Sequence, residues 1–227
     1  MLWNETAVRE NLRNREGKRV FYLGKGDQLT STARDWLSRE RIEILPADQA
    51  KPNGYRLANG AVLTEKPEHM THLNGDVLVS KSHPRILFRG KLDTLEAELI
   101  LCQLTDPGLM TPVGEILNFT RKLIRCDVLE QPFPEERLLG LSEEELRRRS
   151  HLPQKYYGQP HFAPSAADGM AIARLNRARC AAREAELAAV RAFADREGNP
   201  TRVDILRAMN RISSAIYLLM VQEKAKL

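Results

Sequence analysis

The chain has 227 residues and a mass of 25.8 kDa, enough for one large domain or for a domain of about 150 residues with a small partner. Lysine and arginine number 35 against 30 acidic residues, a formal charge of +5, and the signs alternate along the chain, which disfavours nucleic acid as a partner. Three scattered cysteines exclude a disulfide-stapled miniprotein, and the absence of an apolar run of about 18 residues excludes a membrane span, so we expect a cytoplasmic protein.

The sequence pattern of residues 1–66 predicts a small α/β unit. Asn59-Gly60 lies between two strand-like arms, where it tolerates the positive φ of a tight hairpin turn, and residues 64–70 are typical of a linker. Gly24 to Asp27 gives only a weak indication of a phosphate loop and is most simply a turn. The pattern before the hairpin indicates a strand, a helix and a second strand in the order of a βαβ unit: Arg19–Leu23, Ser31–Glu40 and Ile42–Leu45.

Residues 71–227 predict a helical domain, because from Thr71 onward the apolar residues repeat with a period of 3.6. Ser142 and Glu145 form the sequence pattern of a capping box, so a short helix should follow Ser142. We therefore expect a mainly α protein, an up-and-down bundle of four to five helices after the small α/β unit. The long helices are expected at Pro84–Leu104, Pro112–Arg125, Ser165–Asp195 and Val203–Lys224.

Arg179 and Arg183 lie four residues apart on one face of the predicted helix Ser165–Asp195, and Glu186 follows three residues later. Two guanidinium groups one turn apart could grip a polyphosphate with their fork-like donors. The plainer interpretation is a solvated charged stripe, since pairs of this kind are frequent on exposed helices. Each of the three cysteines also lies in a helical pattern, and we interpret all three as ordinary small apolar residues.

Three further features are compatible with an anionic ligand. Lys81 and Arg85 flank the start of a helix, where free backbone N–H groups already favour anions. Asp93 lies near the beginning of that helix, either within reach of a basic partner or simply complementing the helix dipole. Asn210 is a modest helix former in the middle of a helix, which suggests a hydrogen-bonding task or a satisfied interhelical bond.

Four segments in this order resemble the EutT-type ATP:cob(I)alamin adenosyltransferases of ethanolamine utilisation, which are similar in turn to the PduO-type adenosyltransferases. The resemblance covers almost the whole chain, including the N-terminal unit. The segments are THLNGDVLVSKSHPRILFRGKLDTLEAEL (71–99), LLGLSEEELRRRSHLP (138–153), LNRARCAAREAEL (175–187) and ILRAMNRISSAIYLLM (205–220).

The resemblance implies transfer of the 5′-deoxyadenosyl group of ATP to the cobalt of reduced cobalamin, with release of triphosphate. It also implies magnesium bound with ATP, a reductase or reduced flavin for Co(II), and ethanolamine ammonia-lyase as the recipient of the product. The expected assembly is a homotrimer with sites at the subunit interfaces, and the enzyme could work inside an ethanolamine-utilisation microcompartment. The alternative is a non-catalytic adenosylcobalamin carrier or a microcompartment assembly protein.

The resemblance also assigns roles to residues of this chain. Asp93 and Arg179 should form an ion pair between subunits, which makes both necessary for catalysis. Arg183 should contact the phosphates and Glu186 should lie near ATP and its magnesium. The remaining residues expected to bind ATP are Thr71, Asn74, Lys81, Arg85 and Asn210.

The chain departs from the family pattern in two places. Some EutT-type enzymes bind a divalent metal with a His and Cys cluster before the THL segment, but residues 54–70 contain no cysteine here, so no such site is expected. In PduO-type enzymes a phenylalanine lies against the lower face of the corrin ring. The matching position here is either His161 or Phe162, which could also be ordinary loop residues.

Overall fold

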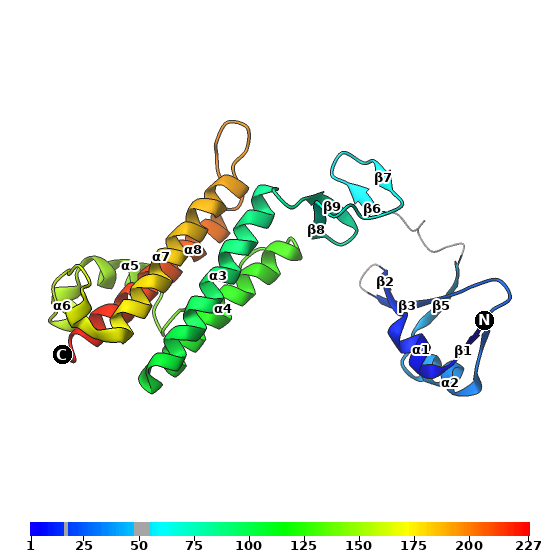
Figure 1. Ribbon diagram of the computed structural model, residues 1–227, viewed down its shortest axis with the longest axis horizontal. Coiled ribbons are helices and arrows are strands. Elements are labelled where there is room, and N and C mark those ends of the chain that lie inside the picture. Colours follow the sequence, from blue (N-terminus) through cyan, green and yellow to red (C-terminus); the bar gives the residue numbers. More distant parts are fainter. Residues whose placement is uncertain (16–17, 48–54) are drawn as a thin grey trace. The chain divides into compact units, whose positions relative to one another are not determined.

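The computed structural model describes residues 1–15, 18–47 and 55–227. The chain divides into two compact units, Met1–Lys66 and Pro67–Leu227, each with its own elements (Figure 1). Within the described residues no helix is long and apolar enough to cross a membrane.

The N-terminal unit contains the expected βαβ arrangement. Strands β3 (Lys18–Leu23) and β5 (Glu43–Pro46) pair in parallel, and α2 (Ser31–Arg39) connects them. Thr30 caps α2 by accepting a hydrogen bond from the Ala33 backbone N–H at 3.3 Å. The sequence did not predict four short elements around this core: β1 (Leu2–Trp3), α1 (Glu5–Glu10), β2 (Arg13–Arg15) and β4 (Gln28–Leu29).

Both tryptophans of the chain pack in this unit. Trp36 is buried, and the half-buried ring of Trp3 packs edge-on against Phe21 with ring centroids 5.3 Å apart. The Trp3 indole N–H donates to Asp27 at 2.9 Å, and the Asp27 backbone N–H donates to the Gly24 carbonyl, so residues 24–27 form a turn. A carboxylate bound in this way makes the turn a poor phosphate loop.

The Asn59-Gly60 hairpin is confirmed. Strands β6 (Tyr55–Leu57) and β7 (Val62–Leu63) are antiparallel, and Gly60 has φ +88°. Such a conformation favours glycine, because a Cβ would be strained there.

The second unit begins with a hairpin that the sequence reasoning missed. Strands β8 (Met70–Asn74) and β9 (Val77–Ser80) are antiparallel, so the helical period expected from Thr71 is wrong over residues 71–80. The hairpin forms because Gly75, with φ +48°, permits the tight turn after Asn74, and the β-branched and apolar residues of β9 suit a strand.

The helices confirm a mainly α fold, with boundaries that differ from the expected ones by a few residues (Figure 1). The α7 helix begins four residues later than expected, because Gly169 with φ +82° separates it from a 3₁₀ turn at Ala166–Asp168. The helices are α3 (Pro84–Thr105), α4 (Met110–Val128), α5 (Glu143–His151), α6 (Pro153–Tyr157), α7 (Gly169–Ala192) and α8 (Val203–Lys224). The capping box of Ser142 and Glu145 at α5 is present.

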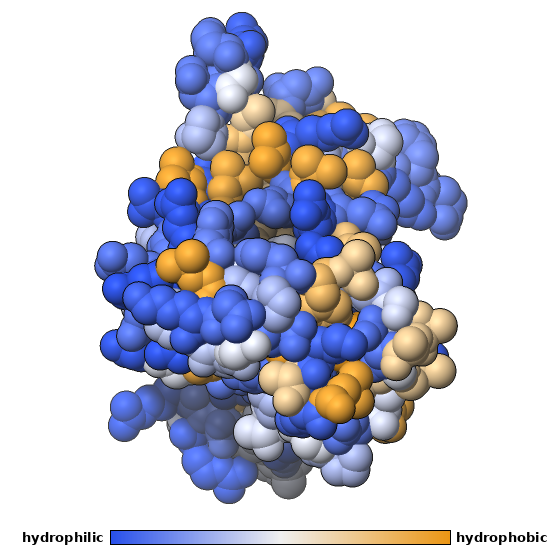
Figure 2. Space-filling model, turned by 90° about the vertical axis from the view of Figure 1, so that its left-hand side faces the viewer, coloured by the Kyte–Doolittle hydropathy of each residue, from blue (hydrophilic) through white to orange (hydrophobic). Residues whose placement is uncertain are grey.

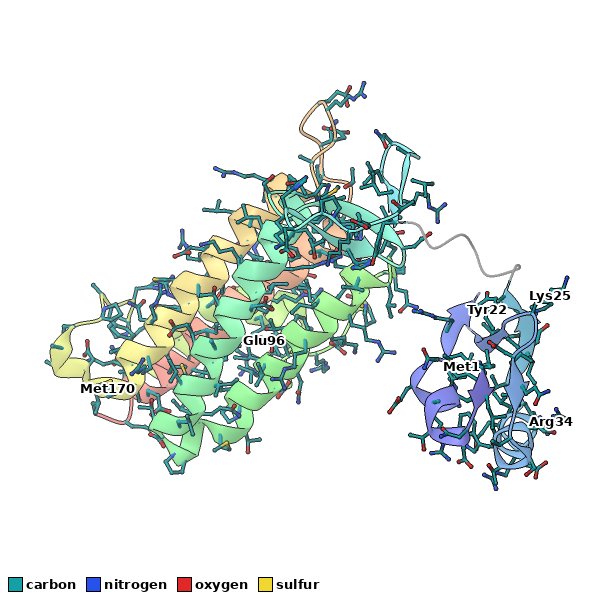
Figure 3. All side chains as sticks on the ribbon, turned by 45° about the vertical axis from the view of Figure 1, so that its right-hand side comes forward. Met1, Tyr22, Lys25, Arg34, Glu96 and Met170 are labelled. Carbon is teal, nitrogen blue, oxygen red and sulfur yellow. The ribbon has the colours of Figure 1, made fainter. Side chains whose placement is uncertain are left out.

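Helices α3 and α7 run antiparallel, since Lys91 pairs with Glu184 at 2.8 Å and Glu98 pairs with Arg177 at 3.1 Å. Alanines occupy most buried positions of α7, which lets neighbouring helices approach closely. Between α3 and α4, Arg121 binds Glu96 at 2.8 Å, and Figure 3 marks Glu96 about half-way along α3.

The end of the helical unit that carries α5, α6 and the C-terminus is mostly hydrophilic. Apolar side chains appear on it in separate groups rather than as one continuous patch (Figure 2). Leu152 and Met170 are among the exposed apolar residues of this unit, with exposed fractions of 50% and 63%.

Candidate active site

A cavity of about 430 Å³ opens between α5, α7, α8 and the loop before α7. Four residues proposed from the sequence, Arg179, Arg183, His161 and Phe162, line it. They come from positions up to 22 residues apart, and the fold brings them to one place. The other lining residues are Ser150, His151, Ser213, Ser214 and Tyr217.

Helix α7 presents its two arginines to this cavity because the alanine-rich side of the helix is buried. Arg183 is exposed, and it has no ion-pair partner in the described part of the chain. Arg179 is half-buried, and its buried Nε atom has no hydrogen-bond partner among the described residues. Its Nη2 atom reaches the Asn176 side chain only at 3.5 Å. Two guanidinium groups that form no ion pair with any described carboxylate make this cavity suited to an anion.

Glu186 lies three residues after Arg183 on α7 and contacts Asn210 on α8. The Asn210 side-chain amide donates to Glu186 Oε1 at 3.3 Å, which gives this mid-helix asparagine the interhelical bond that its position suggested. Asn210 also lines a second cavity of about 370 Å³. The two cavities share His151 and Ser214, so they are adjacent.

Of the polar face that α8 contributes to these cavities, the sequence reasoning identified Asn210 but missed Ser213, Ser214 and Tyr217. Asn210, Ser213, Ser214 and Tyr217 follow at spacings of three, four and seven residues, and one face of a helix has this period. The rest of α8 is largely buried and apolar. A polar stripe on an otherwise buried helix was the signal that could have identified these residues.

His161 and Tyr217 are in direct contact at the cavity. The Nδ1 atom of His161 lies 2.7 Å from the Tyr217 hydroxyl, and Nε2 lies 3.2 Å from the His151 carbonyl. The rings stack with centroids 5.7 Å apart, and the Arg179 guanidinium lies 5.9 Å from the centre of the Tyr217 ring. Burial raises the pKa of Tyr217, although Arg179 and the Phe162 backbone N–H oppose the rise. Its phenol is therefore protonated at neutral pH.

The start of α3 holds a second group of cations. Lys81 is exposed, whereas the Arg85 side chain is bound to Asp127 through Nε at 2.9 Å and to Glu130 through Nη1 at 3.2 Å. Asp127 is fully buried and also accepts from Arg89 at 2.6 Å. No local pattern indicates this buried partner of Arg85, because it lies 42 residues away along the chain.

His83 caps α3, because its Nδ1 atom accepts a hydrogen bond from the Arg85 backbone N–H at 3.2 Å. Burial lowers the pKa of His83, and the charges of Arg85 and Arg89 lower it further. The neutral imidazole is the form that can accept this hydrogen bond.

Thr71, Asn74, Lys81, Arg85 and Asp93 do not line either cavity. Thr71 and Asn74 belong to the β8–β9 hairpin. Asp93 is exposed on α3, and no ion pair of its side chain is found within residues 1–15, 18–47 and 55–227. A single chain thus assembles only part of the residue set that the sequence proposed.

The three cysteines are free thiols. Cys102 and Cys126 are buried and Cys180 is half-buried. Burial raises the pKa of Cys102 to about 12, so this thiol is unreactive at neutral pH. In the described ranges no group of three or more His, Cys, Asp or Glu side chains could hold a metal ion.

Comparison with known proteins gives consistent matches. A family model described as cobalamin adenosyltransferase matches residues 61–223. The corrinoid adenosyltransferase EutT of Salmonella typhimurium strain LT2 is 30% identical, in an alignment that covers 98% of this chain and 92% of the relative. The corrinoid adenosyltransferase EutT of Escherichia coli K12 is 35% identical over 72% of this chain, which spans 62% of that relative's length.

Proposed function

This chain belongs to the cobalamin adenosyltransferase family as an enzyme of the EutT type, which transfers the adenosyl group of ATP to cobalamin, and we propose that the cavity between α5, α7 and α8 is its active site. The observation that carries this assignment is the pair Arg179 and Arg183. Both reach the cavity, and the buried Nε atom of Arg179 lacks an acceptor. A phosphate chain would supply the missing charge at Arg183, and a carboxylate from a neighbouring subunit would supply the acceptor for Arg179.

The reaction does not require a general acid or a general base from the protein. Cobalt of cob(I)alamin donates an electron pair to C5′ of ATP, the Co–C5′ bond forms, and the C5′–O bond breaks with its electron pair leaving on triphosphate. The protein must hold the two substrates in line and stabilise the negative charge that grows on triphosphate. Arg183, which no carboxylate of the described residues binds, is the side chain best suited to that second task.

Glu186 and Asn210 would orient the nucleotide. Their hydrogen bond holds the two side chains together, and within the described residues Glu186 Oε2 is left available for a further ligand. A single carboxylate beside phosphates fits magnesium, which keeps several waters and takes phosphate oxygens as ligands. When bound, magnesium would supply positive charge to the triphosphate, with Glu186 as its ligand from this chain.

The residues that lie away from the cavity are proposed to complete the site of a neighbouring subunit. Asp93 would pair with Arg179 of the next subunit, and Lys81 would reach its triphosphate. The exposed position of Asp93 supports this arrangement, as do apolar side chains exposed on the same helix, Leu87, Ile100, Leu101 and Leu104. A homotrimer is the assembly we propose, with Thr71, Asn74 and Arg85 near the shared nucleotide.

Arg85 differs from Lys81 because its side chain is held by ion pairs within the same chain. Its guanidinium already has carboxylate partners, so we propose that it acts on the phosphates while anchored by Asp127. His161 and Phe162 would face the corrin ring. Their place on the wall of the same cavity as Arg179 supports this role.

We further propose that the enzyme works in the cytoplasm or inside a microcompartment. A reductase or reduced flavin would supply electrons to Co(II), and ethanolamine ammonia-lyase would receive adenosylcobalamin. The resemblance to ethanolamine-utilisation enzymes supports these partners.

A spectrophotometric assay tests the active-site assignment. Purified protein, MgATP and cob(I)alamin should give the absorption spectrum of adenosylcobalamin, with one triphosphate released for each product. Addition of inorganic triphosphate should inhibit the reaction competitively with ATP if the arginines bind that group. Inhibition that is not relieved by ATP, or triphosphate binding that persists in the double variant Arg179→Ala/Arg183→Ala, would contradict the assignment.

A further inference from the structure

The contacts of His161 identify the tautomer of its neutral imidazole. A backbone carbonyl can only accept a hydrogen bond, so the Nε2 atom that faces the His151 carbonyl must carry a proton. In the neutral imidazole Nδ1 is then an acceptor, and the Tyr217 hydroxyl at 2.7 Å must donate to it. Both ring nitrogens of His161 are therefore engaged.

The Tyr217 hydroxyl is well placed to keep this arrangement. Its oxygen lies 2.7 Å from Nδ1 of His161, and burial of the phenol favours the protonated form that can donate. Ring stacking between the two side chains and the nearby Arg179 guanidinium restrict the phenol further. An exposed imidazole would otherwise present a free lone pair in the cavity that we assign to cobalamin.

A free lone pair at this place would have a chemical consequence. Neutral imidazole is a common metal ligand, and axial ligands shift the reduction potential of a bound metal. An axial nitrogen on Co(II) stabilises it against reduction to Co(I), the state that attacks ATP. The protein therefore needs His161 near the corrin ring to stay off the metal.

On the basis of the proposed function, we propose that Tyr217 is a positioning residue whose hydroxyl occupies Nδ1 of His161 and so prevents this imidazole from binding cobalt. Tyr217 itself transfers no group. It acts through His161, and its effect is confined to the reduction of Co(II).

Tyr217→Phe tests this proposal, because it removes only the hydroxyl. Starting from cob(II)alamin with reduced flavin as the one-electron donor, the rate of adenosylcobalamin formation should fall about tenfold or more. Starting from cob(I)alamin that has been chemically reduced beforehand, the rate should fall much less than in the cob(II)alamin assay, because the sensitive step is bypassed. Tyr157→Phe is the matched control, since the half-buried Tyr157 has no hydrogen bond of its hydroxyl among the described residues.

The double variant Tyr217→Phe/His161→Phe separates this role from a merely structural one. Without the imidazole no nitrogen can reach cobalt, so the double variant should be faster than Tyr217→Phe alone in the cob(II)alamin assay. If the tyrosine only supports packing, the second substitution should leave the rate unchanged or lower it, and either result would overturn the proposal.

Electron paramagnetic resonance gives an independent readout. Cob(II)inamide lacks an intrinsic nitrogen base, so any axial nitrogen splitting in its spectrum must come from the protein. With ATP present, the splitting should appear in Tyr217→Phe and be absent in the parent enzyme and in the double variant. Splitting in the parent enzyme, or none in Tyr217→Phe, would overturn the proposal. Failure of the parent enzyme to adenosylate cob(I)alamin would instead refute the proposed function.

Discussion

Arg183 is the single side chain on which the proposed site depends most. It is exposed on α7 and lines the main cavity, and no carboxylate binds it in the part of the chain that the structure describes. We expect Arg183→Ala to lower the turnover number at saturating ATP about a hundredfold or more, because it removes charge stabilisation of the leaving triphosphate. Initial rates of adenosylcobalamin formation measure this effect.

The same substitution should leave folding almost intact. An exposed side chain without partners contributes within about 0.5 kcal/mol to the free energy of unfolding. Arg191→Ala is the matched control, since Arg191 is also exposed on α7 but does not line the cavity. Equal losses of turnover in both variants, or a large drop in the unfolding midpoint of Arg183→Ala, would speak against a role at the phosphates.

Asp204 gives a prediction for the pH dependence of stability. Burial raises its pKa, but hydrogen bonds from Arg202 and from the Phe133 backbone N–H outweigh burial and lower the pKa to about 2. A carboxyl group with a depressed pKa stabilises the fold above its unfolded value, which is about 4, and loses this contribution as pH falls to about 2.

Asp204→Asn should therefore lower the free energy of unfolding by about 1–2 kcal/mol at neutral pH, a value already reduced for solvent screening of this partly exposed pair. The difference from the parent protein should shrink below about pH 4 and vanish near pH 2. Urea titrations across this range measure it. A difference that does not change with pH would show that the carboxylate charge is not what matters.

For individual residues, the sequence predicted well which side chains lie on the same helix face. It did not predict which side chains from distant parts of the chain come into contact. The spacing of Arg179 and Arg183 predicted that both lie on one face of a helix, and in the structure both line one cavity. Tyr217 contacts His161 across 56 residues, and Arg85 contacts Asp127 across 42. Such contacts depend on how helices pack, which a local pattern does not encode.

Among the helices, α7 shows how small residues set the packing distance. Its buried positions are largely alanine, including Ala185, which is fully buried. We expect Ala185→Leu to lower the free energy of unfolding by about 1–3 kcal/mol, because the larger side chain forces the neighbouring helices apart. Thermal or urea unfolding followed by circular dichroism measures the loss.

Ala173→Leu is the control on the same helix, because Ala173 is exposed. Its effect should stay within about 0.5 kcal/mol. A comparable loss in both variants would mean that helix propensity rather than packing determines the effect, although alanine and leucine differ little in propensity.

Helical periodicity predicted the long helices well. It failed in short apolar runs, which fit the period of a strand and the period of a helix equally. The bounds of α8 agree with the expected Val203–Lys224, since a long stripe of apolar residues leaves little ambiguity. The β8–β9 hairpin was missed because a short apolar run such as Val77–Val79 fits a strand or a helix equally, and the turn at Asn74-Gly75 was not weighed. The short elements of residues 2–15 have too few residues for any periodicity to show.

For the whole molecule, the proposed trimer rests on Asp93 and Arg179. Reversing either charge, Asp93→Arg or Arg179→Asp, should weaken assembly and lower activity, because each leaves two like charges facing each other across the interface. The double reversal should recover part of both, with a coupling of about 0.5–3 kcal/mol. Sedimentation equilibrium and turnover, measured on the same samples, follow the two effects.

The outcome of the double reversal is decisive for this pair. A double variant no better than either single variant would remove the support for an intersubunit ion pair. Assembly that is restored without activity would keep the pair but would show that Arg179 also contacts substrate, in agreement with its place on the cavity wall.

The positions of the two tryptophans make it possible to follow the unfolding of each unit separately. Both indoles, Trp3 and Trp36, belong to the core of the N-terminal unit, and the helical unit has none. Tryptophan emission therefore follows unfolding of the first 66 residues, whereas the far-ultraviolet signal is dominated by the long helices of the other unit. Two melting curves recorded on one unlabelled sample would reveal whether the halves of the chain lose their structure together or one after the other.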